Sequence, residues 1–407
     1  MAVPAPAQAE AGAGSLLRSL APLGFVVTLV GLVTSFVSPF LPLFLSTDLH
    51  ASPGQTSLYL FLMPLAAVAV AAGVGRVSDR PGLRGRVLVV GAVTGFVGFL
   101  VFALVRGYWS SLIVALSLIA VAGSLMPQVF AFSRVRLDRT HPARAAMAIS
   151  VLRSLLSLAW VAGPPLAAYL IGLVDFRGLF LVAAVMHLAA LPILITSART
   201  EPPSVVPRVR EIARSKATVS LLRPGAAFVL LQCAGSLGVM AMPLFVSVDL
   251  HRDVATAGLV LGLCAAVEIP LMLLFGLLAA RRSLRILLLV GSGFGIAYFV
   301  TMAITGSVWQ VAVAQVLNAS FIAAIGGLGI SYFQDLMPER PGHATTTFTN
   351  TYRIGAMLAG LLFGLVQVLG YRFSYAIGAV LGAAGLWLLL TTRPGNAALA
   401  PGVEQPD

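Results

Sequence analysis

The sequence predicts an all-α polytopic membrane protein whose twelve transmembrane helices form two pseudo-symmetric six-helix halves. Three observations support this prediction: an apolar composition, twelve long apolar runs, and a motif that is repeated half a chain later. Of the 407 residues, 59% are hydrophobic and only 10% are charged. A soluble protein of this length would need more polar residues to cover its surface. The composition therefore indicates that lipid is the solvent of this chain.

Each apolar run is long enough to cross a hydrocarbon layer roughly 30 Å thick as a helix. Six runs precede, and six follow, a polar stretch that begins at Arg199 and ends at Pro224. The runs lie at 23–46, 56–77, 87–105, 110–133, 147–172, 178–197, 225–248, 256–280, 286–305, 309–333, 346–370 and 374–392. We expect disordered tails over 1–22 and 393–407, six-helix halves over 23–197 and 225–392, and a cytoplasmic linker over 198–224.

The basic residues are distributed unequally between the two sides of the predicted membrane. On the side of both termini, Arg and Lys cluster in 76–86, 134–146 and 198–224. The loops on the other side carry one each, which are Arg106, Arg177, Arg252 and Arg372. The positive-inside rule then places both termini in the cytoplasm and the chain, as a multi-pass protein, in the cell inner membrane. The formal net charge of +12 is therefore explained by the orientation of the chain in the membrane, and no nucleic-acid partner is expected.

Catalytic and cofactor motifs are missing from the sequence. Cys233 and Cys264 both fall inside apolar runs, which indicates neither a disulfide framework nor a metal site. The chain has no HExxH motif, no nucleophile elbow and no ATP-binding loop. We expect no cofactor and no enzyme activity, although a membrane-embedded enzyme is the alternative of a different class.

A nine-residue motif occurs once in each half of the chain. Pro42–His50 reads PLFLSTDLH and Pro243–His251 reads PLFVSVDLH, so that seven positions are identical. Nearly the same spacing relates Arg153 to Arg353 in the fifth and eleventh runs. Parallel repeats about an axis along the membrane normal leave a substrate site between the two halves. The motif therefore predicts internal two-fold symmetry and a central site.

The loop between the second and third runs, Gly75–Arg84, reads GRVSDRPGLR and resembles the signature loop of the major facilitator superfamily. Its glycines permit a tight turn, and Asp79 with Arg80 could latch one rocking state against helix N-termini or basic neighbours. The corresponding loop of the second half, 281–285, keeps the basic residues but has no acid. Such a latch would be one-sided, and an ordinary solvated loop is the alternative.

Several further segments are similar to the bacterial sugar efflux transporters of that superfamily. They are Pro127–Gln128, Leu152–Arg153, Gly163–Pro165, Glu268–Pro270, Leu317–Asn318, Gly326–Gly327, Tyr332–Pro338 and Thr349–Arg353. The resemblance implies a secondary active exporter of lactose-like or glucose-like mono- or disaccharides and glycosides, with alternating access and proton antiport. The expected partners are the sugar, protons and the lipid bilayer, and the expected state is a monomer. A multidrug efflux transporter and a non-transporting membrane sensor stay open as alternatives.

Three formally charged side chains lie well inside predicted spans: Arg153, Glu268 and Arg353. A charge is expensive at such depth and is expected to face a cavity or a partner. Glu268 lies near the middle of its run, which makes it the candidate for proton coupling. It could equally accept hydrogen bonds from sugar hydroxyls or form a structural pair with an arginine. Arg153 and Arg353 are gating or buried-charge candidates that could instead anchor helix ends or pair with Asp335.

A sugar site needs hydrogen-bonding groups for the hydroxyls and an apolar or aromatic face for the ring. In transporters of the resembled superfamily, the first, fourth, seventh and tenth helices line the central cavity. The substrate-binding candidates are Gln128, Gln232, Gln315, Asn318, Asn350, Trp160, Tyr332 and Tyr352. Each could instead be an interhelical hydrogen bond or a packing residue. His187 in the sixth run has no acidic neighbour at helical spacing, and we expect it to be packed rather than to relay protons.

Overall fold

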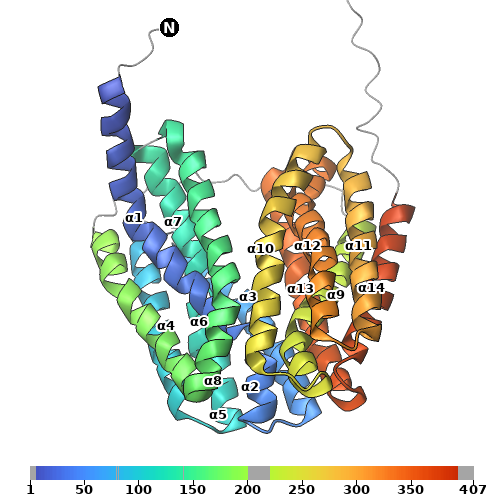
Figure 1. Ribbon diagram of the computed structural model, residues 1–407. Helices are drawn as coiled ribbons and strands as arrows, with labels where there is room; N and C mark the ends of the chain where they lie inside the picture. The colour runs from blue at the N-terminus through green and yellow to red at the C-terminus, as the bar shows by residue number, and fades with distance from the viewer. Residues whose placement is uncertain (1–5, 79, 81, 141, 200–220, 393–407) are drawn as a thin grey trace, which may run out of the picture.

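The computed structural model describes residues 6–78, 80, 82–140, 142–199 and 221–392, and all regular secondary structure in these ranges is helical (Figure 1). The elements are α1 Pro6–Val37, α2 Leu41–Thr47, α3 Pro53–Ser78, α4 Arg84–Leu104, α5 Tyr108–Val114, η1 Ala115–Ile119, α6 Ala120–Ala122, α7 Leu125–Thr140, η2 Pro142–Arg144, α8 Ala145–Arg199, α9 Leu222–Leu244, η3 Phe245–Asp249, α10 Val254–Ala279, α11 Leu284–Ile304, α12 Val308–Leu336, α13 Pro341–Leu369 and α14 Phe373–Thr391.

The predicted helical membrane architecture is confirmed in these residues. Eleven helical segments are long and apolar enough to cross a membrane, and the 55-residue α8 is one of them. Its backbone leaves helical geometry at Val174 and Asp175, where Asp175 has a φ of 54°. Two helices therefore meet at this bend, and the segments account for the twelve predicted spans.

The helices form two bundles. Helices α1 to α8 make one bundle and α9 to α14 the other, and the bundles are further apart at the end where α1 begins than at the end where α2 and α5 lie (Figure 1). Aromatic side chains fill the interior of each bundle. In the first, the Phe44 ring packs on Phe176 and Phe180, and in the second the Phe228 ring packs on Phe333 and Phe348.

The expected N-terminal tail is shorter in the structure than the sequence suggested. Helix α1 begins at Pro6, within the 1–22 segment that was expected to be disordered. Proline suits the first turn of a helix because its missing N–H would have no intrahelical partner there. The alanine, leucine, glutamine and glutamate that follow are good helix formers. The expected tail over 393–407 and most of the expected linker over 198–224 lie outside the described residues.

The repeated motif terminates the first span of each half. His50 and His251 have positive φ values of 46° and 52°, as the left-handed residue of a helix C-terminus requires. The residue after each histidine donates its N–H to a carbonyl six positions back, which completes the cap: Ala51 to Leu45 at 2.8 Å and Arg252 to Val246 at 3.1 Å. The repeat therefore encodes two equivalent helix ends.

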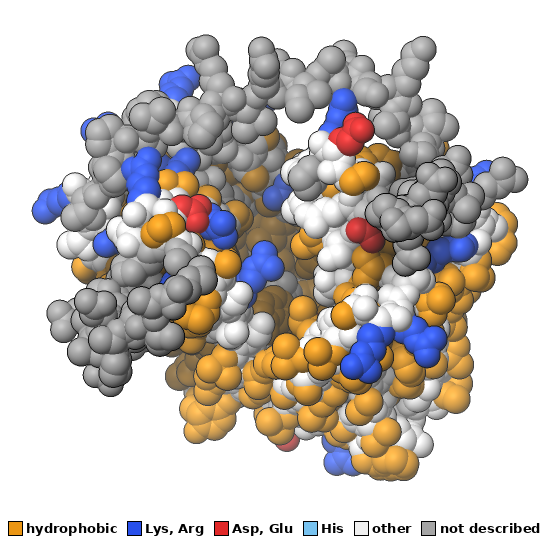
Figure 2. Space-filling model, turned by 90° about the horizontal axis from the view of Figure 1, so that it is seen from above, with side chains coloured by type: hydrophobic (Ala, Val, Ile, Leu, Met, Phe, Trp, Pro, Cys, Tyr) orange, Lys and Arg blue, Asp and Glu red, His pale blue; other side chains and the backbone are white. Residues whose placement is uncertain are grey.

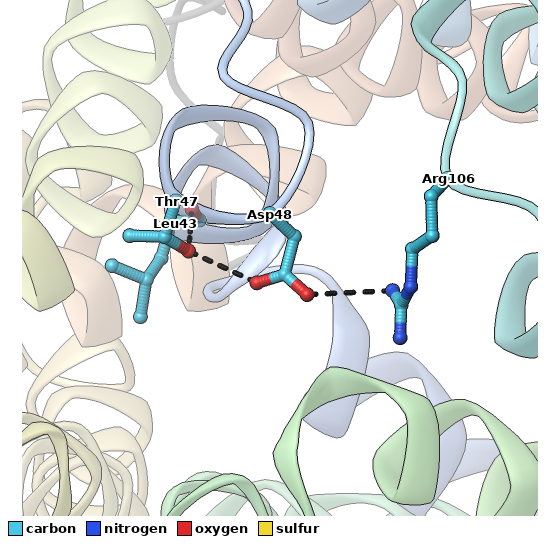
Figure 3. A network of polar contacts seen from close by, with 4 residues as sticks. All are labelled: Leu43, Thr47, Asp48 and Arg106. Atoms are coloured by element: carbon cyan, nitrogen blue, oxygen red, sulfur yellow. Dashed lines mark hydrogen bonds and ion pairs between the residues drawn. The ribbon is translucent and has the colours of Figure 1, made fainter.

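The aspartate of each motif joins this helix end to another loop of the same half. Asp48 lies 3.4 Å from the Arg106 guanidinium in the loop between α4 and α5, and the Thr47 hydroxyl also donates to its carboxylate (Figure 3). In the second half, Asp249 accepts a 2.9 Å hydrogen bond from the backbone N–H of Arg372. The Arg372 guanidinium donates in turn to the Thr305 carbonyl at 2.6 Å. Each half is thus internally fastened at this end.

Candidate functional site

A cavity of about 800 Å³ lies between the two bundles. Viewed from the end where α1 begins, the molecule is hollowed between the halves, and hydrophobic side chains line much of the hollow (Figure 2). Residues of α1, α3, α6 and α8, with single residues of α2, α4, η1 and α7, form its wall on one side, and residues of α9, α10, α12 and α13 form the other. The volume falls in the range of small-molecule sites, which are roughly 300–1,000 Å³.

The wall from the first half is mainly apolar. Helices α1 and α3 contribute valine, leucine, methionine, proline and alanine side chains with few polar groups. The polar exceptions from this half are Thr34, Ser38, Ser157, Trp160 and His187. An apolar surface with an indole is suited to the C–H face of a ring-shaped solute.

The wall from the second half carries the charges of the cavity. Glu268 of α10 and Arg353 of α13 both line it. Neither has an ion-pair partner in the part of the chain that the structure describes, so the predicted structural pair between Glu268 and an arginine does not form in this conformation. Gln232, Ser236, Cys264, Asn318 and the half-exposed Tyr352 add further polar groups to this wall. The cavity is therefore asymmetric, because the charged side chains that line it, Glu268 and Arg353, both come from the second half.

Asn318 is held in place from behind. Its amide nitrogen donates to Gln315 Oε1 at 3.0 Å and to Cys264 Sγ at 3.3 Å. Gln315 in turn donates from Nε2 to the Val311 carbonyl at 3.1 Å. Asn318 is 7% exposed and lines the cavity, whereas Gln315 is fully buried and does not. Cys264 lies one helical turn from Glu268, so the same cavity wall presents both groups.

Four of the predicted substrate contacts lie away from the cavity. Gln315 is behind Asn318, and Tyr332 is buried with its ring stacked on Phe228 at a centroid distance of 6.0 Å. Asn350 is exposed and does not line the cavity. Gln128 of α7 is half-buried outside the cavity wall, and its Oε1 is buried without a hydrogen-bond partner. The other four, Gln232, Asn318, Trp160 and Tyr352, line the cavity together.

The predicted gating residues are more scattered. Arg353 lines the cavity, but its repeat partner Arg153 is exposed outside it. Asp335 and Arg80 are exposed, and Asp335 has no ion-pair partner among the described residues. Asp79 lies outside the described residues. The predicted pairing of the two arginines with Asp335 is therefore not present in this structure.

His187 is the cavity residue whose position the sequence did not reveal. It is 3% exposed, its Nδ1 lies 3.1 Å from the Ala183 carbonyl, and its ring packs on Phe99 at a centroid distance of 5.4 Å. The ring occupies the space beside Gly95, where an added Cβ would lie 2.1 Å from its Cδ2. A glycine facing a histidine across two helices was the available signal. The packed histidine that the sequence predicted thus also contributes to the cavity wall.

The halves close on each other at the end opposite the hollow. The Ser57 hydroxyl of α3 donates to the Leu361 carbonyl at 2.9 Å and accepts from the Gly364 N–H of α13 at 3.0 Å. Two glycines permit backbone contact: a Cβ on Gly360 would lie 2.6 Å from the Leu60 carbonyl carbon, and one on Gly258 would lie 2.5 Å from the Pro164 oxygen. The cavity is therefore sealed at one end and hollowed toward the other.

Comparison with known proteins identifies the family. The model of the major facilitator superfamily matches residues 23–308 and, in a second match, residues 225–406. Sugar efflux transporter B of Salmonella typhimurium is 32% identical over 371 residues, which are 89% of this chain and 93% of that protein. Sugar efflux transporter A of Dickeya chrysanthemi is 33% identical over 366 residues, which are 88% and 92% of the two chains. The crystal structure of the nucleoside transporter NupG superposes with a TM-score of 0.74 at 14% identity, covering 92% of this chain and 98% of that one, and shares the fold.

Proposed function

The chain belongs to the sugar efflux transporters of the major facilitator superfamily and exports sugars, and we propose that it does so in exchange for protons. The carrying observation is the cavity between the halves, which combines an apolar wall with a polar wall that holds one carboxyl group. Alternating access would expose this cavity to the two sides of the membrane in turn. The absence of an ATP-binding loop from the sequence makes the proton gradient the proposed energy source.

The proposed orientation follows from the arginine distribution. The positive-inside rule puts both chain termini in the cytoplasm of the cell and the protein in its inner membrane. The hollow opens at the end where α1 begins, which in the proposed orientation is the cytoplasmic end and supports an inward-facing state (Figures 1 and 2). An exporter loads its substrate in this state. One chain supplies both cavity walls, and we propose that it works as a monomer.

The two walls have different proposed roles. Gln232, Asn318 and Arg353 hydrogen-bond the sugar hydroxyls, while Trp160 and the apolar wall cover the C–H face of the ring. Glu268 takes up and releases the transported proton, because it is the carboxyl group on this wall and has no ion-pair partner among the described residues. Protonation and sugar binding at one wall would compete, which is what antiport requires.

The test is release of sugar from proteoliposomes that contain the purified protein. Vesicles loaded with radiolabelled lactose or glucose are diluted with and without an imposed pH gradient, and vesicles without protein give the background. Protein-dependent release that the gradient accelerates supports sugar/proton exchange. If the rate of release does not depend on the gradient, sugar export is still supported and proton antiport is refuted.

A multidrug efflux transporter is the alternative that the apolar wall favours. It would bind large apolar cations in the same cavity and export them in preference to sugars. The same vesicles loaded with ethidium separate the two functions. Export of ethidium without release of any sugar would refute sugar/proton exchange and support multidrug efflux instead.

A further inference from the structure

We infer that Gln315 is a positioning residue that turns the Asn318 amide so that its oxygen, and not its nitrogen, faces the sugar. The inference rests on the proposed function, because it concerns how the same cavity recognises the hydroxyl groups of the sugar. Gln315 lies one turn before Asn318 on α12 and is fully buried, so it touches the cavity only through Asn318.

The orientation of the Asn318 amide follows from counting hydrogen-bond donors. A primary amide has two N–H groups on its nitrogen and an oxygen that only accepts. Both N–H groups of Asn318 are engaged, one with Gln315 Oε1 at 3.0 Å and one with Cys264 Sγ at 3.3 Å. Among the described residues no group donates to Asn318 Oδ1. The oxygen is therefore the part of this side chain that is left for a ligand.

Gln315 itself has one orientation for the same reason. Its Nε2 donates to the Val311 carbonyl at 3.1 Å, and a carbonyl cannot donate in return. If the Gln315 amide flipped, its oxygen would face that carbonyl oxygen and its nitrogen would face the Asn318 nitrogen. Two repulsive contacts would replace two hydrogen bonds. The α12 backbone thus fixes Gln315, and Gln315 fixes Asn318.

This arrangement gives the cavity a defined preference. An oxygen at the wall accepts a hydrogen bond from a sugar O–H, and it cannot be satisfied by a group that only accepts. A sugar in which the contacted hydroxyl is replaced by hydrogen or fluorine cannot make this bond, and it leaves the oxygen of a buried asparagine unpaired. Sites built to bind a hydroxyl reject analogues that lack it for this reason. Gln315 is therefore a determinant of substrate selectivity that never contacts the substrate.

The test compares glucose with its deoxy and deoxyfluoro analogues as competitors of radiolabelled glucose counterflow in proteoliposomes. For the wild-type protein, we expect one ring position at which the deoxy and the deoxyfluoro analogue both compete about tenfold more weakly than glucose. In Gln315→Leu the Asn318 amide loses its anchor, so this discrimination should fall to about twofold through weaker glucose binding. Gln315→Glu as the neutral acid donates its O–H to the Val311 carbonyl and keeps an acceptor toward Asn318, so it should restore the discrimination.

The matched control is Ser320→Ala. Ser320 is a buried polar residue of the same helix whose hydroxyl bonds only its own turn, to the Val316 carbonyl at 2.8 Å. A general packing defect in α12 would lower the flux of glucose and its analogues alike, in this control and in Gln315→Leu. The double variant Gln315→Leu/Asn318→Leu should behave like Asn318→Leu alone, because both residues act through one oxygen.

The two possible failures are distinguishable. If the wild type discriminates and Gln315→Leu discriminates equally, the positioning role is refuted while sugar export stands. If Gln315→Leu and Asn318→Leu lower selectivity additively, Gln315 acts separately from Asn318 and the inference is again refuted. If the wild type shows no counterflow of any sugar, the proposed function fails, and the inference fails with it.

Discussion

Replacement of Ser57 by Ala tests which contacts keep the far end of the cavity closed. The substitution removes the hydroxyl that bonds both the Leu361 carbonyl and the Gly364 N–H across the interface between the halves. Two hydrogen bonds contribute a net of about 1–3 kcal/mol at about 0.5–1.5 kcal/mol each. The Ser57 side chain is only partly buried, so we take the lower part of that range. A loss of about 1 kcal/mol shifts the equilibrium toward the outward-facing state about fivefold.

Spin labels on the two halves measure this shift. Trp109 and Trp309 are 63% and 67% exposed near the starts of α5 and α12, at the closed end, and both can be replaced by labelled cysteines after Cys233 and Cys264 are changed to serine. Pulsed electron resonance should show a larger fraction of long distances in Ser57→Ala.

The control for this experiment is Ser46→Ala. The Ser46 hydroxyl bonds the Leu43 carbonyl of its own helix at 2.9 Å and does not cross the interface. An unchanged distance distribution in Ser57→Ala, or an equal change in the control, would refute the assignment of Ser57 to the closure.

Three other substitutions address separate parts of the mechanism. Glu268→Gln should abolish the acceleration of sugar release by a pH gradient while counterflow stays within about threefold of wild type; preserved acceleration would exclude Glu268. Gly360→Val should populate the open distance in the same spin-label experiment, because its Cβ would lie 2.6 Å from a facing backbone carbon, whereas Gly276→Val has open space and should not. Arg372→Ala should cost about 2 kcal/mol and lower the thermal midpoint in detergent, with Arg252→Ala as the control on the same face.

The number and order of the spans could be predicted from the sequence because the bilayer fixes the length of an apolar run. The same physics brought out Glu268, since a charged group inside such a run needs a partner or a cavity. Asn318 was a candidate because the resemblance to sugar efflux transporters placed its helix at the central cavity. The structure places both on the cavity wall. What the residues do within the wall, including proton coupling, stays a prediction.

The rotation of each helix could not be predicted in the same way. In a soluble helix the polar face marks the solvent, but here lipid and the protein interior are both apolar and the periodic signal is lost. Gln315 and Asn318 are three residues apart and looked equivalent, yet only Asn318 reaches the cavity. Tyr332 looked like a stacking platform and proved to be core packing against Phe228. The apolar wall carried no signal, because its valines and leucines resemble those that face lipid.

The repeated motif explains why closure at one end can be reversed without unfolding either half. Within each half, the motif aspartate fastens the first helix end to a neighbouring loop through Arg106 or Arg372. Between the halves at the same end, the contacts are glycine packing, apolar packing such as that of Leu60 and Phe363 in one core cluster, the Ser57 bonds and a 3.5 Å bond from Gln367 to the Ala51 carbonyl. Among the described residues none of these is an ion pair, whereas the contacts within each half are charge-assisted. A load on this end should therefore separate the halves before it disturbs either one. Rigid-body rocking then disturbs fewer charge-assisted contacts than a rearrangement within either half would.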